Sequence, residues 1–241
     1  MNLAIDFGNT LVKAAVFEMG DMIHFESHAN FSIRKLQVLL KKFKIRGAIV
    51  SSVVNDSGPV EAYLKKSYHF VKLNPSTVLP ISNQYETPGS LGMDRLAGMA
   101  GANLILPGKH VLVINAGTCI TYDVITAHAA YYGGSISPGL EMRLKALHTF
   151  TDRLPLVRKQ FSHDLFGKST STAILTGVVQ GAYYEMMGFI AAYKKTYKGI
   201  RVVLTGGDAP IFETMSKSKI FAVPNLVLYG LNKILALNEP D

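Results

Sequence analysis

The sequence predicts an α/β protein made of two copies of one supersecondary unit. Apolar runs over residues 3–5 and 11–17 flank the turn residues Gly8 and Asn9, a pattern typical of a β-hairpin. A similar pattern returns in residues 111–126, where Asn115 aligns with Asp6 and Gly117 with Gly8. This offset is close to half of the 241 residues, which indicates a duplication. The alternative is chance similarity between two β-rich stretches.

The elements that follow the first hairpin predict a βββαβαβ half. Ser32 is a helix cap, and the poorly alternating run over residues 47–53 favours a buried parallel strand. The expected elements are a strand over residues 21–28, a helix over 32–44, a strand over 47–53, a helix over 59–66 and a strand over 69–73. Residues 74–90 are rich in proline and are expected to form a loop.

The second half is expected to echo the first. Two strands flank the Asn115 loop, and a strand over residues 130–137 follows. The other expected elements are helices over residues 139–149 and 171–197, a strand over 201–204, a helix over 209–217, a short strand near Ile220 and a helix over 225–237. The domains are therefore expected at 1–109 and 110–241, with the last helix free to pack back on the first domain.

Composition narrows the class of protein. Hydrophobic residues make up 48% and charged residues 17%, which predicts a folded core rather than disorder. The net charge of +8 is spread along the chain, and no basic run alternates with stacking aromatics, so nucleic acid is not an expected partner. A positive field still favours small anionic substrates.

Cysteine content and hydropathy predict a cytoplasmic protein without a membrane segment. Cys119 is the single cysteine, so no disulfide can form within the chain, as in a reducing compartment. The first apolar run lacks the basic segment of a signal peptide. Gln180 and Glu185 interrupt the longest apolar stretch, residues 173–193, which favours a buried helix over a membrane span.

The first hairpin loop has the groups that hold a polyphosphate. Gly8 and Asn9 tolerate positive φ, which would let backbone N–H groups converge, while Thr10 and Lys13 add side-chain donors. Asp6 is the candidate ligand for the accompanying Mg²⁺. The alternative is an ordinary hairpin whose Asp6 caps its own turn. Two such loops facing each other would make a cleft that grips a nucleotide from both sides.

A second candidate is the acidic and basic pair Asp94-Arg95, which follows Gly92 and leads into a helix expected over residues 96–103. A helix start and a neighbouring guanidinium both lower the pKa of a carboxyl group. An ionised Asp94 can accept a proton from an attacking hydroxyl, and Arg95 can grip a substrate carboxylate at two points. The alternative is a capping pair without chemistry.

Two glycine motifs complete the candidates. The motifs are residues 133–140 and the Gly206-Gly207 pair. Each either lets the backbone approach a ligand closely or simply forms a tight turn. Neither motif is specific alone. The chain has no GxxxxGK[ST] loop, which excludes a P-loop enzyme, and no Gly-x-Ser-x-Gly elbow.

Taken in order, these motifs resemble the type III pantothenate kinases of the acetate/sugar kinase, Hsp70 and actin superfamily. The matching segments are residues 6–13, Tyr85 with residues 91–95, 115–118, 133–140, 167–170 and 204–208. The resemblance implies two duplicated ribonuclease H-like domains with an interdomain nucleotide cleft. It also implies a phosphotransferase that converts ATP and pantothenate into 4′-phosphopantothenate, the first step of coenzyme A biosynthesis.

The resemblance also implies roles for single residues. It makes Asp94 the catalytic base. It assigns the ATP site with its Mg²⁺ to Asp6, Phe7, Gly8, Asn9, Thr10, Leu11, Val12, Lys13, Thr118, Gly206 and Gly207. It assigns the pantothenate site to Tyr85, Gly92, Met93, Asp94, Arg95 and, from the partner subunit of a homodimer, Thr170. The family has an aspartate that binds a monovalent cation where this chain has Asn115, so a K⁺ or NH₄⁺ site would lack its usual carboxylate.

Two other functions remain open at this point. One is a kinase for another small alcohol of the same superfamily. The other is a non-catalytic, transcription-related accessory protein, a label that some relatives of this fold carry. Asp94 and Arg95 favour catalysis. The apolar residues on more than one face of residues 171–197 favour a homodimer.

Overall fold

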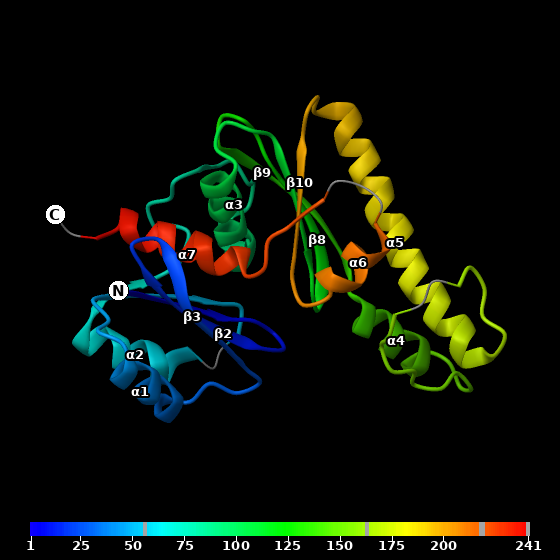
Figure 1. The fold of residues 1–241 in the computed structure, drawn as a ribbon, viewed down its shortest axis with the longest axis horizontal. Coiled ribbons are helices and arrows are strands. Elements are labelled where there is room, and N and C mark those ends of the chain that lie inside the picture. The colour runs from blue at the N-terminus through cyan, green and yellow to red at the C-terminus, as the bar shows by residue number, and fades with distance from the viewer. Residues whose placement is uncertain (55–56, 162–163, 217–219, 240–241) are drawn as a thin grey trace. The chain divides into compact units, whose positions relative to one another are not determined.

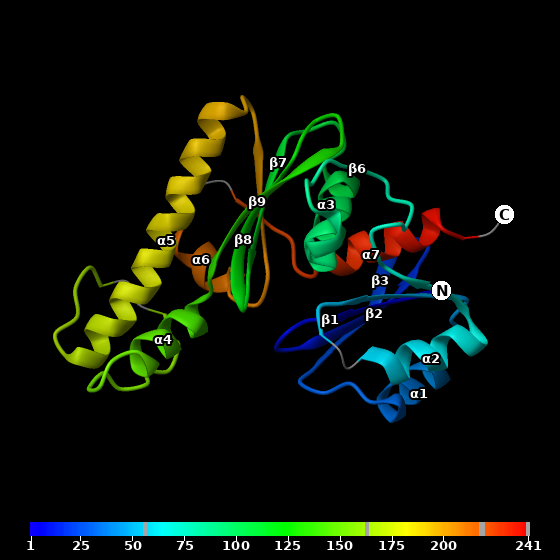
Figure 2. The ribbon, with the colours of Figure 1, turned by 180° about the vertical axis from the view of Figure 1, so that it is seen from behind.

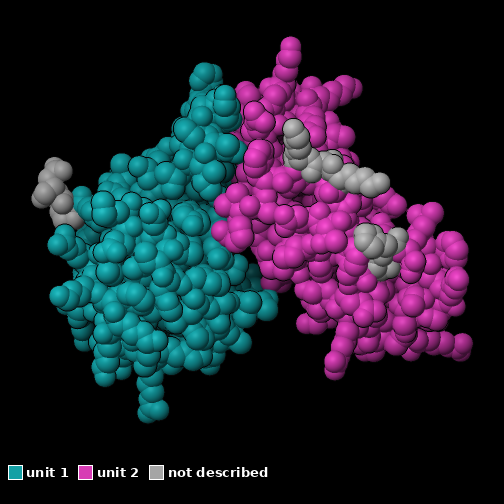
Figure 3. All heavy atoms as spheres, in the orientation of Figure 1, with its two compact units in different colours: residues 1–109, 125–133, 225–241 teal, residues 110–124, 134–224 magenta. Residues whose placement is uncertain are grey.

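The computed structural model describes residues 1–54, 57–161, 164–216 and 220–239. Contacts divide the chain into two compact units (Figure 3). Unit 1 contains residues 1–109, 125–133 and 225–241, and unit 2 contains residues 110–124 and 134–224. The domain assignment 1–109 and 110–241 stays a prediction.

Unit 1 is built on a five-stranded sheet in the order β3-β2-β1-β4-β5. Its strands are β1 (Asn2–Phe7), β2 (Val12–Glu18), β3 (Asp21–His28), β4 (Gly47–Ser52) and β5 (His69–Lys72). Its helices are α1 (Ile33–Lys42), α2 (Gly58–Ser67), α3 (Met93–Ile105) and α7 (Leu226–Leu237). Strands β1 and β2 form the predicted antiparallel hairpin, and Ser32 caps α1 as predicted.

Helices cover both faces of this sheet (Figure 1). Successive side chains of a strand point to opposite faces, so β1 serves two cores. Leu3, Ile5 and Phe7 pack with α1 and α2, whereas Ala4 packs with α3 and α7. Asp6 therefore lies on the face that α3 covers.

Helices α3 and α7 approach each other closely enough that two glycines face backbone atoms. A Cβ on Gly101 would lie 2.5 Å from the Leu226 carbonyl oxygen, and a Cβ on Gly230 would overlap the Ala97 carbonyl oxygen. Only glycine permits this distance between the two helix axes.

We expect Gly230→Ala to lower the free energy of unfolding by about 1–3 kcal/mol, because α7 must move away from α3. Gly98→Ala is the matched control, since a Cβ there has no neighbouring atom within 4 Å. The control should gain about 0.5–1 kcal/mol from helix propensity. Urea unfolding of both variants measures the difference, and equal stability would contradict the close packing.

The second sheet repeats the strand order of the first. The second sheet has the order β11-β10-β7-β8-β9-β6, so its first five strands correspond to β5-β4-β1-β2-β3. Its strands are β6 (Ser82–Asn83), β7 (Val111–Ala116), β8 (Cys119–Ile125), β9 (Ala130–Pro138), β10 (Arg201–Thr205) and β11 (Phe221–Ala222). This shared order confirms the predicted duplication.

One face of the second sheet is covered by α5 (Thr170–Thr196) and α6 (Ala209–Met215), and α4 (Leu140–Thr149) packs against α5 (Figure 2). Buried residues of β7, β8 and β10 pack there against Ile174, Val178 and Met186 of α5. Two helices thus follow β9, where α1 alone follows β3.

The structure corrects three expected boundaries. The loop over residues 74–90 contains strand β6, which pairs with Ala130 and Tyr131, and a 3₁₀ helix at Pro88–Ser90. Helix α3 begins at Met93 rather than residue 96, since Gly92 is its N-cap. Helix α6 ends at Met215, and the expected end at Lys217 lies outside the described residues.

Candidate functional site

The loop over residues 6–13 connects β1 to β2. Lys13 lies opposite Asp6 in the antiparallel ladder, so both side chains point to the same face of the sheet. The Gly8 N–H donates to the Leu11 carbonyl oxygen at 3.2 Å, and a Cβ on Gly8 would lie 3.0 Å from that oxygen. Neither Gly8 nor Asn9 has positive φ, so the expected left-handed turn does not form.

Asp6 is a buried carboxylate, and one of its oxygens has no hydrogen-bond partner in the part of the chain that the structure describes. Its side chain faces Ser51 across the β1–β4 pair, yet neither Asp6 Oδ1 nor Ser51 Oγ has a hydrogen-bond partner among the described residues. Burial, and then the negative charge of Asp94, raise the pKa of Asp6 from 3.8 to about 7, while Lys13 and the neighbouring Ser51 hydroxyl act in the opposite direction. A buried, unpartnered carboxylate oxygen fits a cation ligand.

Asp94 lies in the first turn of α3, on the side of the sheet that Asp6 faces. Gly92 caps this helix, and a Cβ there would lie 2.6 Å from Asp94 Oδ1. Glycine thus leaves room for the carboxylate at the helix start. Asp94 is near enough for its negative charge to contribute to the raised pKa of Asp6.

Arg95 and Tyr85 lie together in unit 1. The guanidinium carbon of Arg95, a buried residue, lies 5.6 Å from the centre of the Tyr85 ring, within cation–π range. The Tyr85 ring stacks on Tyr131 with ring centres 6.2 Å apart, and a Cβ on Gly133 would lie 3.0 Å from it. Half-buried Met93 lies between Gly92 and Asp94 in the chain.

Sequence reasoning missed Ser51 and Tyr131. Ser51 lies in a uniformly buried strand without any motif, and only its register with Asp6 brings it to the site. Tyr131 lies two residues before the Gly133-Gly134 motif, which is the one local signal that could have indicated it.

The second loop lies in unit 2, with Asn115 at the position in β7 that Asp6 has in β1. Thr205 pairs with Asn115 as Ser51 pairs with Asp6. Gly206, at a φ of +98°, lies so close that a Cβ would be 2.7 Å from Asn115 Oδ1. The Gly139 N–H donates to the Thr118 carbonyl oxygen at 3.1 Å.

The Gly206-Gly207 motif is followed by a partly buried ion pair. Asp208 is buried, its N–H donates to the Ala116 carbonyl oxygen at 2.9 Å, and its carboxylate accepts a hydrogen bond from Lys159 Nζ. This contact joins the motif to the segment after α4. Lys159 lies in a stretch without a recognisable motif, so the sequence offered no signal for it.

Thr170 is the first residue of α5 in unit 2 and is exposed. The N-cap Ser169 and Thr172, on either side of it in the chain, form a capping box. A Cβ on Gly167 would overlap the start of α5, so this segment packs closely against the helix.

Within the described part of the chain, no three His, Cys, Asp or Glu side chains gather as metal ligands. A Mg²⁺ ion that arrives with a nucleotide needs only one or two carboxylates, since phosphates and waters complete its shell. Asp6 meets this requirement. Among the described helices, none has the length and apolar character needed to cross a bilayer.

Solved structures share this fold at low identity. A Campylobacter jejuni protein assigned to the Baf family of transcriptional activators matches with a TM-score of 0.65 and 23% identity, over 98% of each chain. An activator of 2-hydroxyisocaproyl-CoA dehydratase from Clostridium difficile, solved with bound ADPNP, matches with a TM-score of 0.54 and 12% identity, over 98% of this chain and 93% of the other.

Closer relatives identify the family. The family model described as type III pantothenate kinase matches residues 2–192. Type III pantothenate kinases from Bacteroides fragilis and Phocaeicola vulgatus are 48% and 45% identical over 240 residues, and each alignment covers 99% of both chains. This chain therefore belongs to the type III pantothenate kinases.

Proposed function

We propose that this enzyme transfers the γ-phosphoryl group of ATP to pantothenate and forms 4′-phosphopantothenate, the first step of coenzyme A biosynthesis. Membership in the family supports the reaction. The observation that carries the catalytic assignment is that two carboxylates, Asp6 on β1 and Asp94 in the first turn of α3, belong to the same face of the sheet.

In this mechanism Asp94 is the general base. It accepts the proton of the pantothenate hydroxyl while that oxygen attacks the γ-phosphorus and the bond to the β-phosphate oxygen breaks, releasing ADP. Asp6 would hold Mg²⁺ through its unpartnered oxygen, and the chemistry supplied at this position would be neutralisation of phosphate charge. Lys13, opposite Asp6, adds a positive charge beside the phosphates.

The substrates divide between two groups of residues. We assign pantothenate to Tyr85, Gly92, Met93 and Arg95, with the Arg95 guanidinium as a two-point partner for the carboxylate. We assign further ATP contacts to Thr118, Gly206 and Gly207. A cytoplasmic location fits ATP as a substrate and the single cysteine.

The test is ADP formation from purified protein with ATP, Mg²⁺ and pantothenate. Pantothenate-dependent ADP release supports the proposed reaction. Release that depends on a different small alcohol would indicate another kinase of the superfamily. Absence of phosphoryl transfer to any of these alcohols would favour the non-catalytic accessory protein.

We also propose a homodimer, but its subunits meet through a different surface from the one that the sequence indicated. The apolar residues of α5 that suggested a dimer are all buried or partly buried in this chain: Ile174, Leu175, Val178, Val179, Tyr183, Met186, Met187, Phe189 and Ile190. Most belong to the core of unit 2 or pack against it. The helix therefore uses this face for its own sheet.

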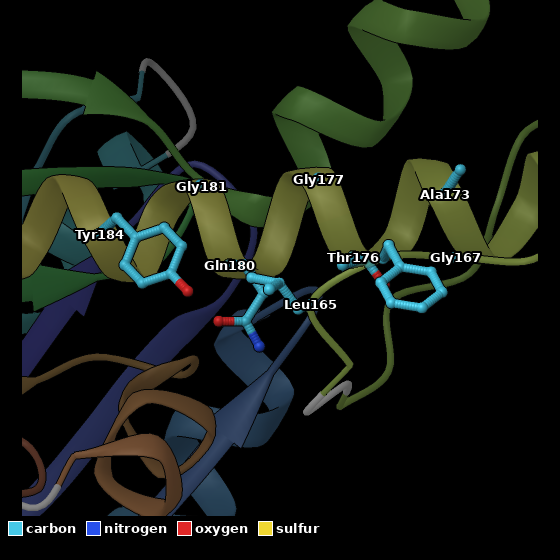
Figure 4. Close-up of a pocket in the computed structure, with 9 residues that line it drawn as sticks. Leu165, Gly167, Ala173, Thr176, Gly177, Gln180, Gly181 and Tyr184 are labelled. Carbon is cyan, nitrogen blue, oxygen red and sulfur yellow. The ribbon is translucent and has the colours of Figure 1, made fainter.

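Another stripe of α5 remains open. Gln180 and Tyr184 project from one side of α5, beside Gly177 and Gly181, in a cavity of about 380 Å³ (Figure 4). Tyr184 is 55% exposed. We propose that a second copy packs here, because glycines let helices approach closely, and that Thr170 reaches pantothenate bound to the partner subunit.

Gly181→Leu should convert the dimer into monomers, because the new side chain would block helix contact between copies. A Cβ on Gly181 has no neighbour within 4 Å, so the subunit itself should remain folded. Gly58→Leu, at an equally open helical glycine, is the control and should stay dimeric. Sedimentation measures both variants, and a fully active monomer of the unmutated enzyme at assay concentration would overturn the dimer.

Asn115 leads us to propose an enzyme that depends little on K⁺ or NH₄⁺. The residue offers a neutral amide where the family offers a carboxylate, and hard cations prefer charged oxygen ligands. The amide can instead donate directly to a phosphate oxygen. Carbonyl oxygens of the same loop are the competing source of a cation site.

Asn115→Asp should introduce dependence on K⁺ or NH₄⁺. Turnover is measured with a bulky organic cation as the sole monovalent cation, and then with KCl at matched ionic strength. The unmutated enzyme should respond weakly, while the variant should be stimulated. Strong stimulation of the unmutated enzyme by K⁺ would refute the interpretation of Asn115.

A further inference from the structure

Arg143 of α4 holds the segment that connects β9 to α4. Its Nε donates to the Pro138 carbonyl oxygen at 2.8 Å, and its Nη2 donates to Ser137 Oγ at 2.7 Å. The same Nη2 donates to Glu185 Oε2 of α5 at 2.5 Å. The planar guanidinium thus ties the last two residues of β9 to the long helix of unit 2.

Glu185 is itself held in place. Tyr122 Oη of β8 donates to Glu185 Oε1 at 2.9 Å, and the Tyr122 ring stacks on Phe189 with ring centres 4.1 Å apart. Partial burial alone would raise the pKa of Glu185, but hydrogen bonds from Arg143, Ser137 and Tyr122 hold it below the usual value. Glu185 is therefore an ionised partner for Arg143 at neutral pH.

The held segment continues directly into the second loop. Gly139 follows Pro138 and donates its N–H to the Thr118 carbonyl oxygen at 3.1 Å, and a Cβ on Gly139 would overlap the Gly117 carbonyl oxygen. A shift of Pro138 must therefore move residues 117–118. All of these residues belong to unit 2.

We propose that Arg143 and Glu185 are positioning residues, which fix the loop over residues 115–118 through the Ser137–Gly139 segment and thereby set the affinity for ATP. This inference rests on the proposed function, in which Thr118 contacts ATP. Neither side chain touches substrate in this proposal. Their loss weakens nucleotide binding and leaves the pantothenate contacts of unit 1 in place.

Arg143→Lys and Glu185→Gln test the pair. Lysine at position 143 keeps the positive charge but cannot donate the several hydrogen bonds of the guanidinium group. Glutamine at position 185 keeps the shape of the side chain but removes its negative charge. Each should raise the Kd for a non-hydrolysable ATP analogue about tenfold to a hundredfold, the usual range for a lost hydrogen bond to a charged group. The KM for pantothenate should change by less than about threefold in each variant.

Matched controls lie on the same helix. Lys145→Arg and Glu141→Gln make similar changes at exposed positions of α4 and should leave nucleotide affinity unchanged. In the double variant Arg143→Lys/Glu185→Gln, the loss of nucleotide affinity should be smaller than the sum of the losses in the two single variants, because both substitutions disrupt the same interaction. Tyr122→Phe removes the hydroxyl that donates to Glu185 and keeps the ring stacked on Phe189. This variant should also weaken nucleotide binding, and it tests the proposal if Arg143→Lys fails to fold.

The outcomes separate this inference from the proposed reaction, because nucleotide binding is measured without pantothenate. Unchanged nucleotide affinity in all variants, or equal weakening for ATP and pantothenate, would overturn the positioning role while ADP formation by the unmutated enzyme stands. Failure of the unmutated enzyme to bind the analogue would overturn both.

Discussion

Asp94→Asn is expected to lower turnover by about a hundredfold to ten-thousandfold, the usual contribution of a general base. Asparagine keeps the size of the side chain at the start of α3 and removes its ability to accept a proton. Pantothenate should still bind, because Arg95 and Tyr85 stay in place. Steady-state kinetics and direct binding measurements give the two quantities separately.

Glu86→Gln is the control, since Glu86 is an exposed carboxylate in the segment that precedes α3. It should retain nearly full turnover. Near-normal kcat in Asp94→Asn would show that another group is the base. Loss of pantothenate binding together with turnover would show that Asp94 also holds the substrate.

Asp6→Asn should have opposite effects on activity and stability. Activity should fall at least about a hundredfold, because the amide is a poor ligand for a divalent ion that contributes several kcal/mol to the transition state. In protein without nucleotide or metal, however, the variant should be more stable at pH 8. The ionised carboxylate is buried there without a partner for Oδ1.

The sign of the pH dependence follows from the raised pKa of Asp6, about 7 against 3.8. Between these values the folded state binds the proton more tightly than the unfolded state, so stability falls as pH rises from about 4 through 7. The gain from Asp6→Asn should approach up to about 4 kcal/mol above pH 7 and vanish near pH 3.

Urea unfolding at several pH values measures this dependence. Asp21→Asn, at an exposed carboxylate of β3, is the control and should show no such trend. A gain that is the same at pH 4 and pH 8 would contradict burial of a titrating Asp6.

Local patterns predicted the elements that carry their own signals. The Gly8-Asn9 hairpin, the Ser32 cap and the repeated strand–loop–strand of residues 111–126 all depend on neighbouring residues, and the structure confirms these elements. The roles of Asp94, Arg95 and Thr118 stay predictions.

What the sequence did not reveal depends on contacts between distant residues. Strand β6 is only two residues long and forms through its pairing with β9. Ser51, Tyr131 and Lys159 reach their partners through strand register or through loops without a pattern. The apolar faces of α5 were visible in the sequence, but which face its own sheet covers depends on the fold.

The packing of α7 on α3 has a consequence for the order in which the protein can fold. Helix α7 follows every residue of unit 2 in the chain, yet it covers the face of the first sheet that carries Ala4 and Asp6. A nascent chain on the ribosome therefore keeps the part of that face that α7 covers open to water and to chaperones until translation has passed through unit 2. The helix that carries Asp94 has its full set of neighbours only after α7 has been synthesised.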